Sequence, residues 1–159
     1  MNKSDLIKLL KEYKENKSKW NLALKEIKNK ENTIKKVRDD IDISSSSTGI
    51  NNDIHSKNSI SDKTGKQAID IAGRISALED EIQKLKEEKD NYADKVDEVD
   101  IRLKALTEKE YLVVYYHYIE DYTYAYIGDN QYFNSFKQTR SEKIIKGIAH
   151  IAINKMAKI

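Results

Sequence analysis

Basic and amide side chains cluster near the C-terminal end of the chain, and their types suit the recognition of nucleic-acid bases. The candidates are Lys137, Gln138, Arg140, Ser141, Lys143 and Lys146. From a helix in the major groove, arginine and lysine pair with guanine edges and glutamine pairs with adenine. The alternative is an ordinary solvated basic surface. We expect DNA contact by the group, with Lys146, Lys155 and Lys158 at phosphates or serving as surface charge.

No comparable pattern indicates catalysis. The histidines lie far apart and have no carboxylate at ligand spacing, so we expect no metal site. They are His55, His117 and His150. Four acidic residues near the middle of the chain are typical of a solvated helix face rather than of a catalytic carboxylate pair. They are Asp94, Asp97, Glu98 and Asp100. With no glycine-rich phosphate loop either, we expect no enzyme and no cofactor.

The elements that would present the basic residues form a predicted helix-turn-helix. Thr107 is a suitable N-cap and Glu110 can complete a capping box, so a first helix should begin there and continue to Ile119. Thr123 is the expected cap of a short second helix that ends near Gly128.

A turn-like stretch, Asp129–Asn134, precedes the expected final helix. Asn134 or Ser135 is a reasonable cap for that helix. Several apolar residues of this helix recur at helical spacing and are expected to face the core. They are Ile144, Ile148, Ile151 and Ala152.

Two long helices are expected before this region. In the first, apolar residues recur at steps of three, four or seven: Leu6, Leu10, Tyr13, Trp20, Leu24, Ile27, Ile34 and Ile41, with Lys17, Glu31 and Arg38 at the missed positions. In the second the repeat is stricter: Ile75, Leu78, Ile82, Leu85, Tyr92, Val96, Val99, Leu103 and Leu106, broken by Lys89. This spacing predicts a coiled coil.

Length and charge favour pairing of the two helices within one chain. Residues 4–42 and 66–104 are equally long, roughly 58 Å each at the α-helical rise. Residues 1–40 carry a net charge of +5 and residues 74–108 carry −4. We predict an antiparallel hairpin that can also dimerise, and pairing between chains is the alternative. Residues 44–65, rich in Ser, Asn, Asp and Gly, are expected to be a flexible connector.

The predicted fold class is therefore all-α: a long antiparallel helical hairpin, or coiled-coil stem, followed by a small helix-turn-helix domain. The expected parts are a first stem helix at 1–43, a linker at 44–65, a second stem helix at 66–106 and the helix-turn-helix domain at 107–159. Eight of the ten tyrosines fall in the 22 residues from Tyr111 to Tyr132. We expect them to pack the small core and its junction with the stem rather than to stack on bases.

Composition agrees with long solvated helices. Charged residues make up 35% of the chain, which has no proline and no cysteine. The net charge of +2 is unevenly distributed, because residues 131–159 alone carry +5. No apolar run is long enough to span a membrane, and the first residues lack the apolar core of a signal peptide. A cytoplasmic protein is expected.

The segment Leu106–Ile151 resembles the helix-turn-helix of sigma factor region four. The whole chain resembles the phage and prophage regulators of the ArpU/RinA type. The matching blocks are Leu106–Glu110, Tyr115–Glu120, Tyr122–Tyr124 with Ile127–Gly128, and Lys146–Ile148 with Ile151. The resemblance implies a scaffold helix, a positioning helix with Gly128 at a site for a small residue, and a DNA-reading helix. The chain departs from the family at His117, where arginine is common, and in a longer segment after Gly128. If Thr139 matches the threonine of the family motif, the final helix takes a second register, with Arg140 at a position that is normally apolar.

Together these features predict a sequence-specific regulator of transcription that binds double-stranded DNA. Its stem would dimerise or contact a partner such as RNA polymerase, and the resemblance implies a bacterial phage or prophage origin. The alternative is a coiled-coil interaction or assembly protein whose helix-turn-helix docks protein rather than DNA.

Overall fold

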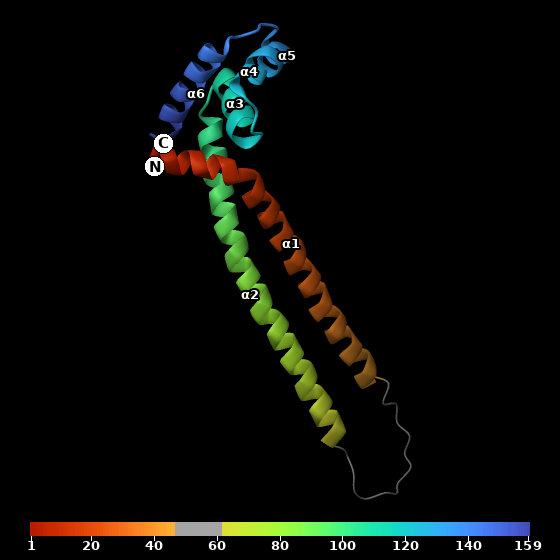
Figure 1. The fold of residues 1–159 in the computed structure, drawn as a ribbon. Coiled ribbons are helices and arrows are strands. Elements are labelled where there is room, and N and C mark those ends of the chain that lie inside the picture. The colour runs from red at the N-terminus through yellow and green to blue at the C-terminus, as the bar shows by residue number, and fades with distance from the viewer. Residues whose placement is uncertain (47–61) are drawn as a thin grey trace, which may run out of the picture. The chain divides into compact units, whose positions relative to one another are not determined.

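The structure is a computed structural model that describes residues 1–46 and 62–159; the side chains of residues 41–46, 62–65 and 67 are left out of the description. The elements in chain order are α1 (Lys3–Ser46), α2 (Asp62–Lys104), α3 (Glu108–Val114), η1 (Tyr115–Ile119), α4 (Tyr124–Tyr126), η2 (Ile127–Gln131), α5 (Tyr132–Phe136) and α6 (Glu142–Met156) (Figure 1). Every regular element of the described residues is a helix, which confirms the predicted all-α class. Most of the predicted 44–65 linker lies outside the described residues.

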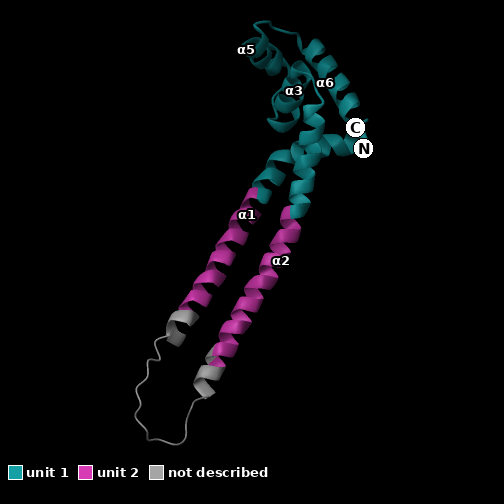
Figure 2. Cartoon of the chain, turned by 180° about the vertical axis from the view of Figure 1, so that it is seen from behind, with its two compact units in different colours: residues 1–20, 90–159 teal, residues 21–89 magenta. Residues whose placement is uncertain are grey.

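The contacts divide the chain into two compact units (Figure 2). Unit 1 comprises residues 1–20 and 90–159, and unit 2 comprises residues 21–89. Each long helix therefore belongs partly to both units. The small helices that follow α2 share their unit with the first turns of α1.

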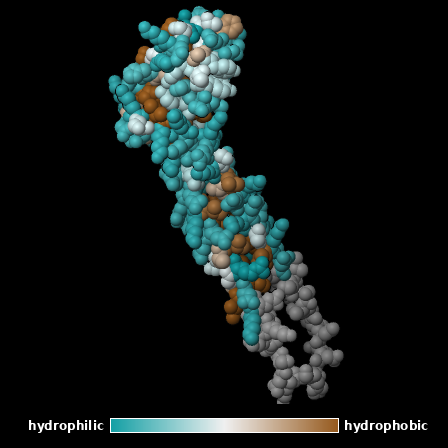
Figure 3. Space-filling view, in the orientation of Figure 1, coloured by the Kyte–Doolittle hydropathy of each residue, from teal (hydrophilic) through white to brown (hydrophobic). Residues whose placement is uncertain are grey.

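Unit 2 is held by an apolar seam between α1 and α2. Its residues are Ile27 and Ile34 of α1 with Ile75, Leu78, Ile82 and Leu85 of α2. Figure 3 shows hydrophobic side chains along the middle of these helices, with hydrophilic ones beside them. Lys30 pairs with Glu81, and Arg38 contacts Glu79 at 2.9 Å. The basic helix thus lies against the acidic one, as their charges predicted.

The seam of α1 differs in detail from the predicted one. Leu24 is 43% exposed, while the neighbouring Ala23 is buried. Likewise Asn16 is buried and Lys17 is exposed. A step of one residue rotates a side chain by about 100° around a helix. After Tyr13 the next buried residue is therefore Asn16, three positions on, and not Lys17, four positions on as predicted. Ala23 follows Asn16 by seven residues and lies on the same side of α1, so Leu24 points outward.

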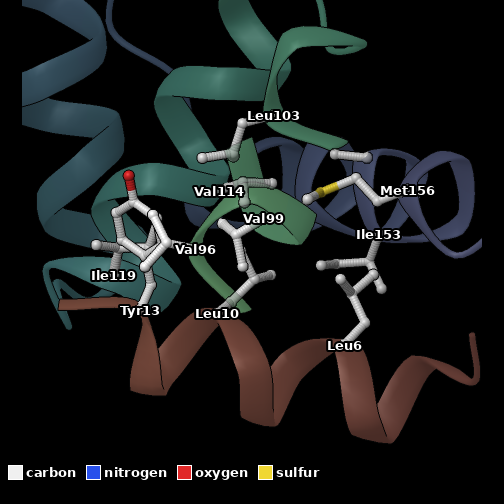
Figure 4. Packing of buried hydrophobic residues seen from close by; sticks show 11 residues of the cluster. Leu6, Leu10, Tyr13, Val96, Val99, Leu103, Val114, Ile119, Ile153 and Met156 are labelled. Carbon is white, nitrogen blue, oxygen red and sulfur yellow. The ribbon is translucent and has the colours of Figure 1, made fainter. Parts of the chain in front are cut away.

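The core of unit 1 joins both ends of the chain to the last part of α2 (Figure 4). It contains Leu6, Leu10 and Tyr13 of α1, Val96, Val99 and Leu103 of α2, Val114 and Ile119 of α3–η1, and Ala152, Ile153 and Met156 of α6. Leu10 and Val99 are both fully buried within it. Their presence in one cluster agrees with the predicted pairing of the two long helices within one chain.

A partly buried hydrogen bond lies at the edge of this core. The Tyr13 hydroxyl donates to Asp100 Oδ1 at 2.7 Å. Burial, and then the hydrogen bond to the Asp100 carboxylate, raise the pKa of Tyr13 above its ordinary value. Tyr13 therefore stays protonated, and able to donate this hydrogen bond, to a higher pH than an ordinary tyrosine.

The start of α3 has the predicted capping box. The Thr107 amide donates to Glu110 Oε2 at 2.8 Å, and the Glu110 amide donates to Thr107 Oγ1 at 3.4 Å. Lys155 of α6 also reaches Glu110, at 3.2 Å. The hydrogen bond from the Thr107 amide contributes most to holding the pKa of Glu110 below its ordinary value, and the Thr107 side chain and Lys155 add to the effect. One carboxylate thus secures the start of α3 and ties α6 to it.

The seam of unit 2 can be tested by two neighbouring substitutions. Ile27→Ala empties a buried site and should lower the free energy of unfolding by about 2–5 kcal/mol. Leu24→Ala, one turn earlier, removes an exposed side chain and should cost less than about 0.5 kcal/mol. Denaturant unfolding followed by circular dichroism measures both. Equal losses at the two positions would show that Leu24 belongs to the seam after all.

The capping carboxylate should make stability depend on pH. Because the pKa of Glu110 is lowered by folding, its contribution is complete above the ordinary value of 4.5 and is lost as pH falls through the lower folded value. Glu110→Gln keeps a capping-box acceptor and removes the charge. At pH 7 it should cost roughly 0.3–1 kcal/mol. Denaturant titrations should show this gap closing below pH 4.5, and a constant gap would contradict the role given to the charge.

Candidate nucleic-acid interface

Three helical segments surround a second small core in unit 1. α3–η1 is the first segment, α4–η2–α5 is the second, and α6 is the third. The core between them contains Leu112, Val113, Ile127, Tyr132, Ile145 and Ala149, with Tyr116, Tyr124, Phe136 and Ile148 against it. The expected order of helix, short helix, turn and basic helix is therefore present, but its boundaries differ from the predicted ones.

The stretch predicted as a turn, Asp129–Asn134, is helical. α4, η2 and α5 follow one another without a break from Tyr124 to Phe136. In η2 the Tyr132 amide donates to the Ile127 carbonyl, five residues earlier. This wider π-helical turn brings Ile127 and Tyr132 to the same side, where both are buried. Burial of an aromatic ring thus outweighs the turn-forming tendency of Gly128 and Asp129.

The turn itself lies just after Phe136. Lys137 ends α5 in the left-handed conformation, with φ of 55°. Ser141 is extended and precedes α6, which begins at Glu142. The predicted start at Asn134 or Ser135 is therefore wrong. Lys137, Gln138 and Arg140 lie in the turn before the last helix, and Lys143 and Lys146 lie on that helix. Ser141 occupies the N-cap position, but its side chain makes no capping hydrogen bond.

A glycine permits the close approach that shapes this turn. The Arg140 amide donates to the Gly128 carbonyl at 3.2 Å. A Cβ atom on Gly128 would lie only 2.0 Å from the Arg140 carbonyl oxygen and 3.3 Å from Cγ1 of Ile145. The predicted need for a small residue at Gly128 is thus confirmed. The closest contact, however, is made by the backbone of the turn.

α6 is rotated relative to the prediction. Its buried residues are Ile145, Ala149, Ala152, Ile153 and Met156. Ile144 is 48% exposed and Ile151 is 60% exposed, so the expectation that they face the core is wrong, whereas Ala152 is buried as expected. Ala149 and Ala152 are small, and they allow α6 to pack closely on α3. Because α6 is apolar on two sides, its pattern alone could not select the buried one.

The basic side chains of the turn are engaged locally. Arg140 donates to Gln138 Oε1 at 2.7 Å and lies 5.9 Å from the centre of the Tyr132 ring. Lys137 donates to the Asn134 carbonyl at 3.2 Å. These contacts hold the turn and leave the outer surface of Lys137 and Gln138 exposed.

The basic side chains of α6 differ in their freedom. Lys146 pairs with Glu142 at 2.6 Å and lies 5.9 Å from the Tyr124 ring centre. Lys155 pairs with Glu110. Lys143 is exposed and makes no such contact within the part of the chain described here. The structure therefore places the six predicted residues along one turn and the start of one helix, but leaves Lys143 the least constrained cation among them.

The tyrosines mainly pack, as predicted. Tyr132 is 2% exposed, and Tyr116 and Tyr124 lie against the second core. Tyr116 stacks on Tyr122, which is 38% exposed and meets Tyr126 edge to face. The cluster thus continues from the core to the surface at the start of α4.

His117 joins the first segment to the second. Its Nδ1 lies 2.8 Å from the Tyr122 carbonyl oxygen, and its ring stacks on Tyr124 with centres 3.7 Å apart. This position supports the loop between η1 and α4. Among the described residues, no group of His, Asp and Glu could hold a metal ion. Nor does any of their helices have the length and apolar character needed to cross a membrane.

Sequence reasoning named Lys143 on the outward surface of α6 but missed Gly147 and His150 beside it. Lys143, Gly147 and His150 are exposed along it, at steps of four and three. No atom lies within 4 Å of the position that a Cβ on Gly147 would take. A glycine in the middle of a helix, without a packing reason, was the signal in the sequence, because glycine weakens helices.

Comparison of the chain with models of protein families, with curated proteins and with solved structures finds no match.

Two glycine substitutions should have opposite effects. Gly128→Ala forces the turn away from α4–η2 and should destabilise unit 1 by about 1–3 kcal/mol or more. Gly147→Ala meets open space and should stabilise α6 by about 0.5–1 kcal/mol. Thermal unfolding by circular dichroism compares the two. A stabilising Gly128→Ala would contradict the close contact with Arg140.

Proposed function

We propose that unit 1 binds double-stranded DNA, with α6 entering the major groove and the turn before it lying at the phosphate backbone. The observation that carries the proposal is the exposed surface of α6, which directly follows an exposed basic turn. An α-helix presented on a small helical scaffold is of the size that the major groove admits.

Electrostatics supports a polyanionic partner. The turn and the first turns of α6 contain Lys137, Arg140, Lys143 and Lys146, and Glu142 is the acidic residue among them. Because Glu142 is paired with Lys146, the surface keeps an excess of positive charge. Such a surface gains affinity by releasing counterions from phosphates. Lys137 and Lys143 are well placed for this role because both are exposed.

A regulatory role is proposed from the resemblance to phage and prophage regulators. One small module makes few base contacts, so a second DNA-bound copy or RNA polymerase would add to its affinity. We therefore propose that the protein associates through α1 and α2, either with a second copy of itself or with RNA polymerase. A cytoplasmic location is also part of the proposal.

A second function, docking to a protein, has its own supporting observation. Apolar side chains other than those of the seam lie exposed on unit 1. They include Tyr126 and Phe133, each 45% exposed, as well as Ile144 and Ile151. Exposed aromatic and aliphatic side chains are common at protein interfaces. Their basic surroundings favour nucleic acid over protein as the partner of α6.

A double substitution tests the DNA proposal. Lys137→Ala with Lys143→Ala removes two cations from the proposed surface and should weaken duplex binding. The slope of log K against log salt concentration should become shallower by about 2. Fluorescence anisotropy with a labelled duplex over a range of salt concentrations measures both effects.

The matched control is Lys25→Ala with Lys28→Ala, which removes the same charge from exposed positions of α1 in unit 2. It should leave the salt slope close to that of the wild type. Equal effects of the two double variants would show that residues 137–146 do not form the DNA-binding site. Absence of salt-sensitive duplex binding by the wild type would favour protein docking.

A further inference from the structure

We propose that Ile144 and Ile151 contact the 5-methyl groups of thymines, so that α6 prefers duplexes rich in A·T pairs. The inference rests on the DNA-binding function proposed above and adds how the sequence is selected. It arises from the rotation of α6, which leaves two large isoleucines outside the core.

The two isoleucines lie on one strip of the helix. They are seven residues apart, which is about two turns or 10.5 Å along the axis. Bases along one DNA strand are spaced by about 3.4 Å, so the two side chains would meet positions about three base pairs apart. Both are about half exposed or more, at 48% and 60%, so each has surface available for an apolar contact.

Gly147 lies between them and makes a close approach possible. No atom is found within 4 Å of the Cβ position at Gly147, so the backbone of α6 is uncovered there. A side chain at this point would hold the helix away from the floor of a groove. With glycine, the flanking isoleucines can reach methyl groups at the base edges.

Two of the basic side chains near this strip are already engaged. Lys146 is held by Glu142, and Arg140 is held by Gln138 and the ring of Tyr132. Their donors would have to leave these partners to pair with bases. Apolar contact with a thymine methyl requires no such exchange, and it is an established form of base recognition.

Charge argues against a second copy of α6 as the occupant of this strip. An antiparallel pair centred between Gly147 and Ile148 would place Lys155 near Arg140 of the other copy. Like charges in such positions oppose association. The same cations are favourable beside phosphates. The combination of isoleucines with flanking basic residues therefore fits DNA better than a second chain.

The experiment compares duplexes that differ only in the methyl group at C5 of the pyrimidine. The probes are an alternating A·T duplex, the same duplex with deoxyuridine in place of thymidine, an alternating G·C duplex, and its 5-methylcytosine form. Anisotropy titrations at one salt concentration give the affinities. The protein should bind the thymine duplex more tightly than the uracil duplex, by about fourfold for each methyl group that it covers.

Variants link this preference to the proposed residues. Ile144→Ala with Ile151→Ala should bind the thymine and uracil duplexes equally and keep the salt dependence of the wild type. Ile101→Ala, at a 57% exposed position of α2, should keep the preference for thymine. Circular dichroism melting checks that the variants remain folded, which is expected because the substituted side chains are exposed.

The outcomes separate the two proposals. Salt-sensitive binding with equal affinity for thymine and uracil duplexes would overturn the methyl contacts and leave DNA binding intact. A thymine preference that survives in the Ile144→Ala, Ile151→Ala variant would also overturn the assignment to these residues. Failure of the wild type to bind any of the four duplexes would overturn the function itself. Preference for the 5-methylcytosine duplex over the plain G·C duplex would support contact with the methyl group, whether the base pair is A·T or G·C.

Discussion

The joint burial of α1, α2 and α6 in one apolar core is the interaction on which unit 1 depends. Leu10 and Val99 are fully buried there, and Met156 of α6 is buried with them. Complete burial of one such side chain is worth about 1.5–3 kcal/mol, against a total stability of about 5–15 kcal/mol for a typical domain. By seating Met156 and Ile153, this core fixes the rotation of α6. The surface that carries Lys143 and Gly147 is outward as a result.

Much of the fold follows from local patterns in the sequence. The heptad spacing of α2 and the opposite charges of the stem helices predict the hairpin, and the Thr107–Glu110 box predicts the start of α3. The seam of α1 is less predictable. Leu24 is the more hydrophobic choice for the interior, yet it is exposed and Ala23 is buried instead. Such a choice depends on both helices together.

The candidate site was predictable in composition but not in geometry. The basic residues after position 136 are evident in the sequence, and their grouping at one turn and helix start is seen in the structure. The boundaries were missed because a π-helical turn buries Tyr132 and extends the second helical segment through a stretch of turn-forming residues. The rotation of α6 was missed because isoleucines occur on two of its sides, and only the tertiary contacts of the buried side decide between them.

Unit 1 combines residues 1–20 with residues 90–159, which are far apart in the sequence. This separation determines the order in which the protein can fold during synthesis. The apolar side chains Leu6 and Leu10 leave the ribosome long before their partners in α2 and α6 are made. Contacts between such distant parts of a chain form late, because a long loop must close first. Unit 2 joins residues closer in sequence and can pair earlier. A nascent chain therefore exposes the strip containing Leu6 and Leu10 until α2 and α6 have been made, and this interval is the time in which a chaperone would find it.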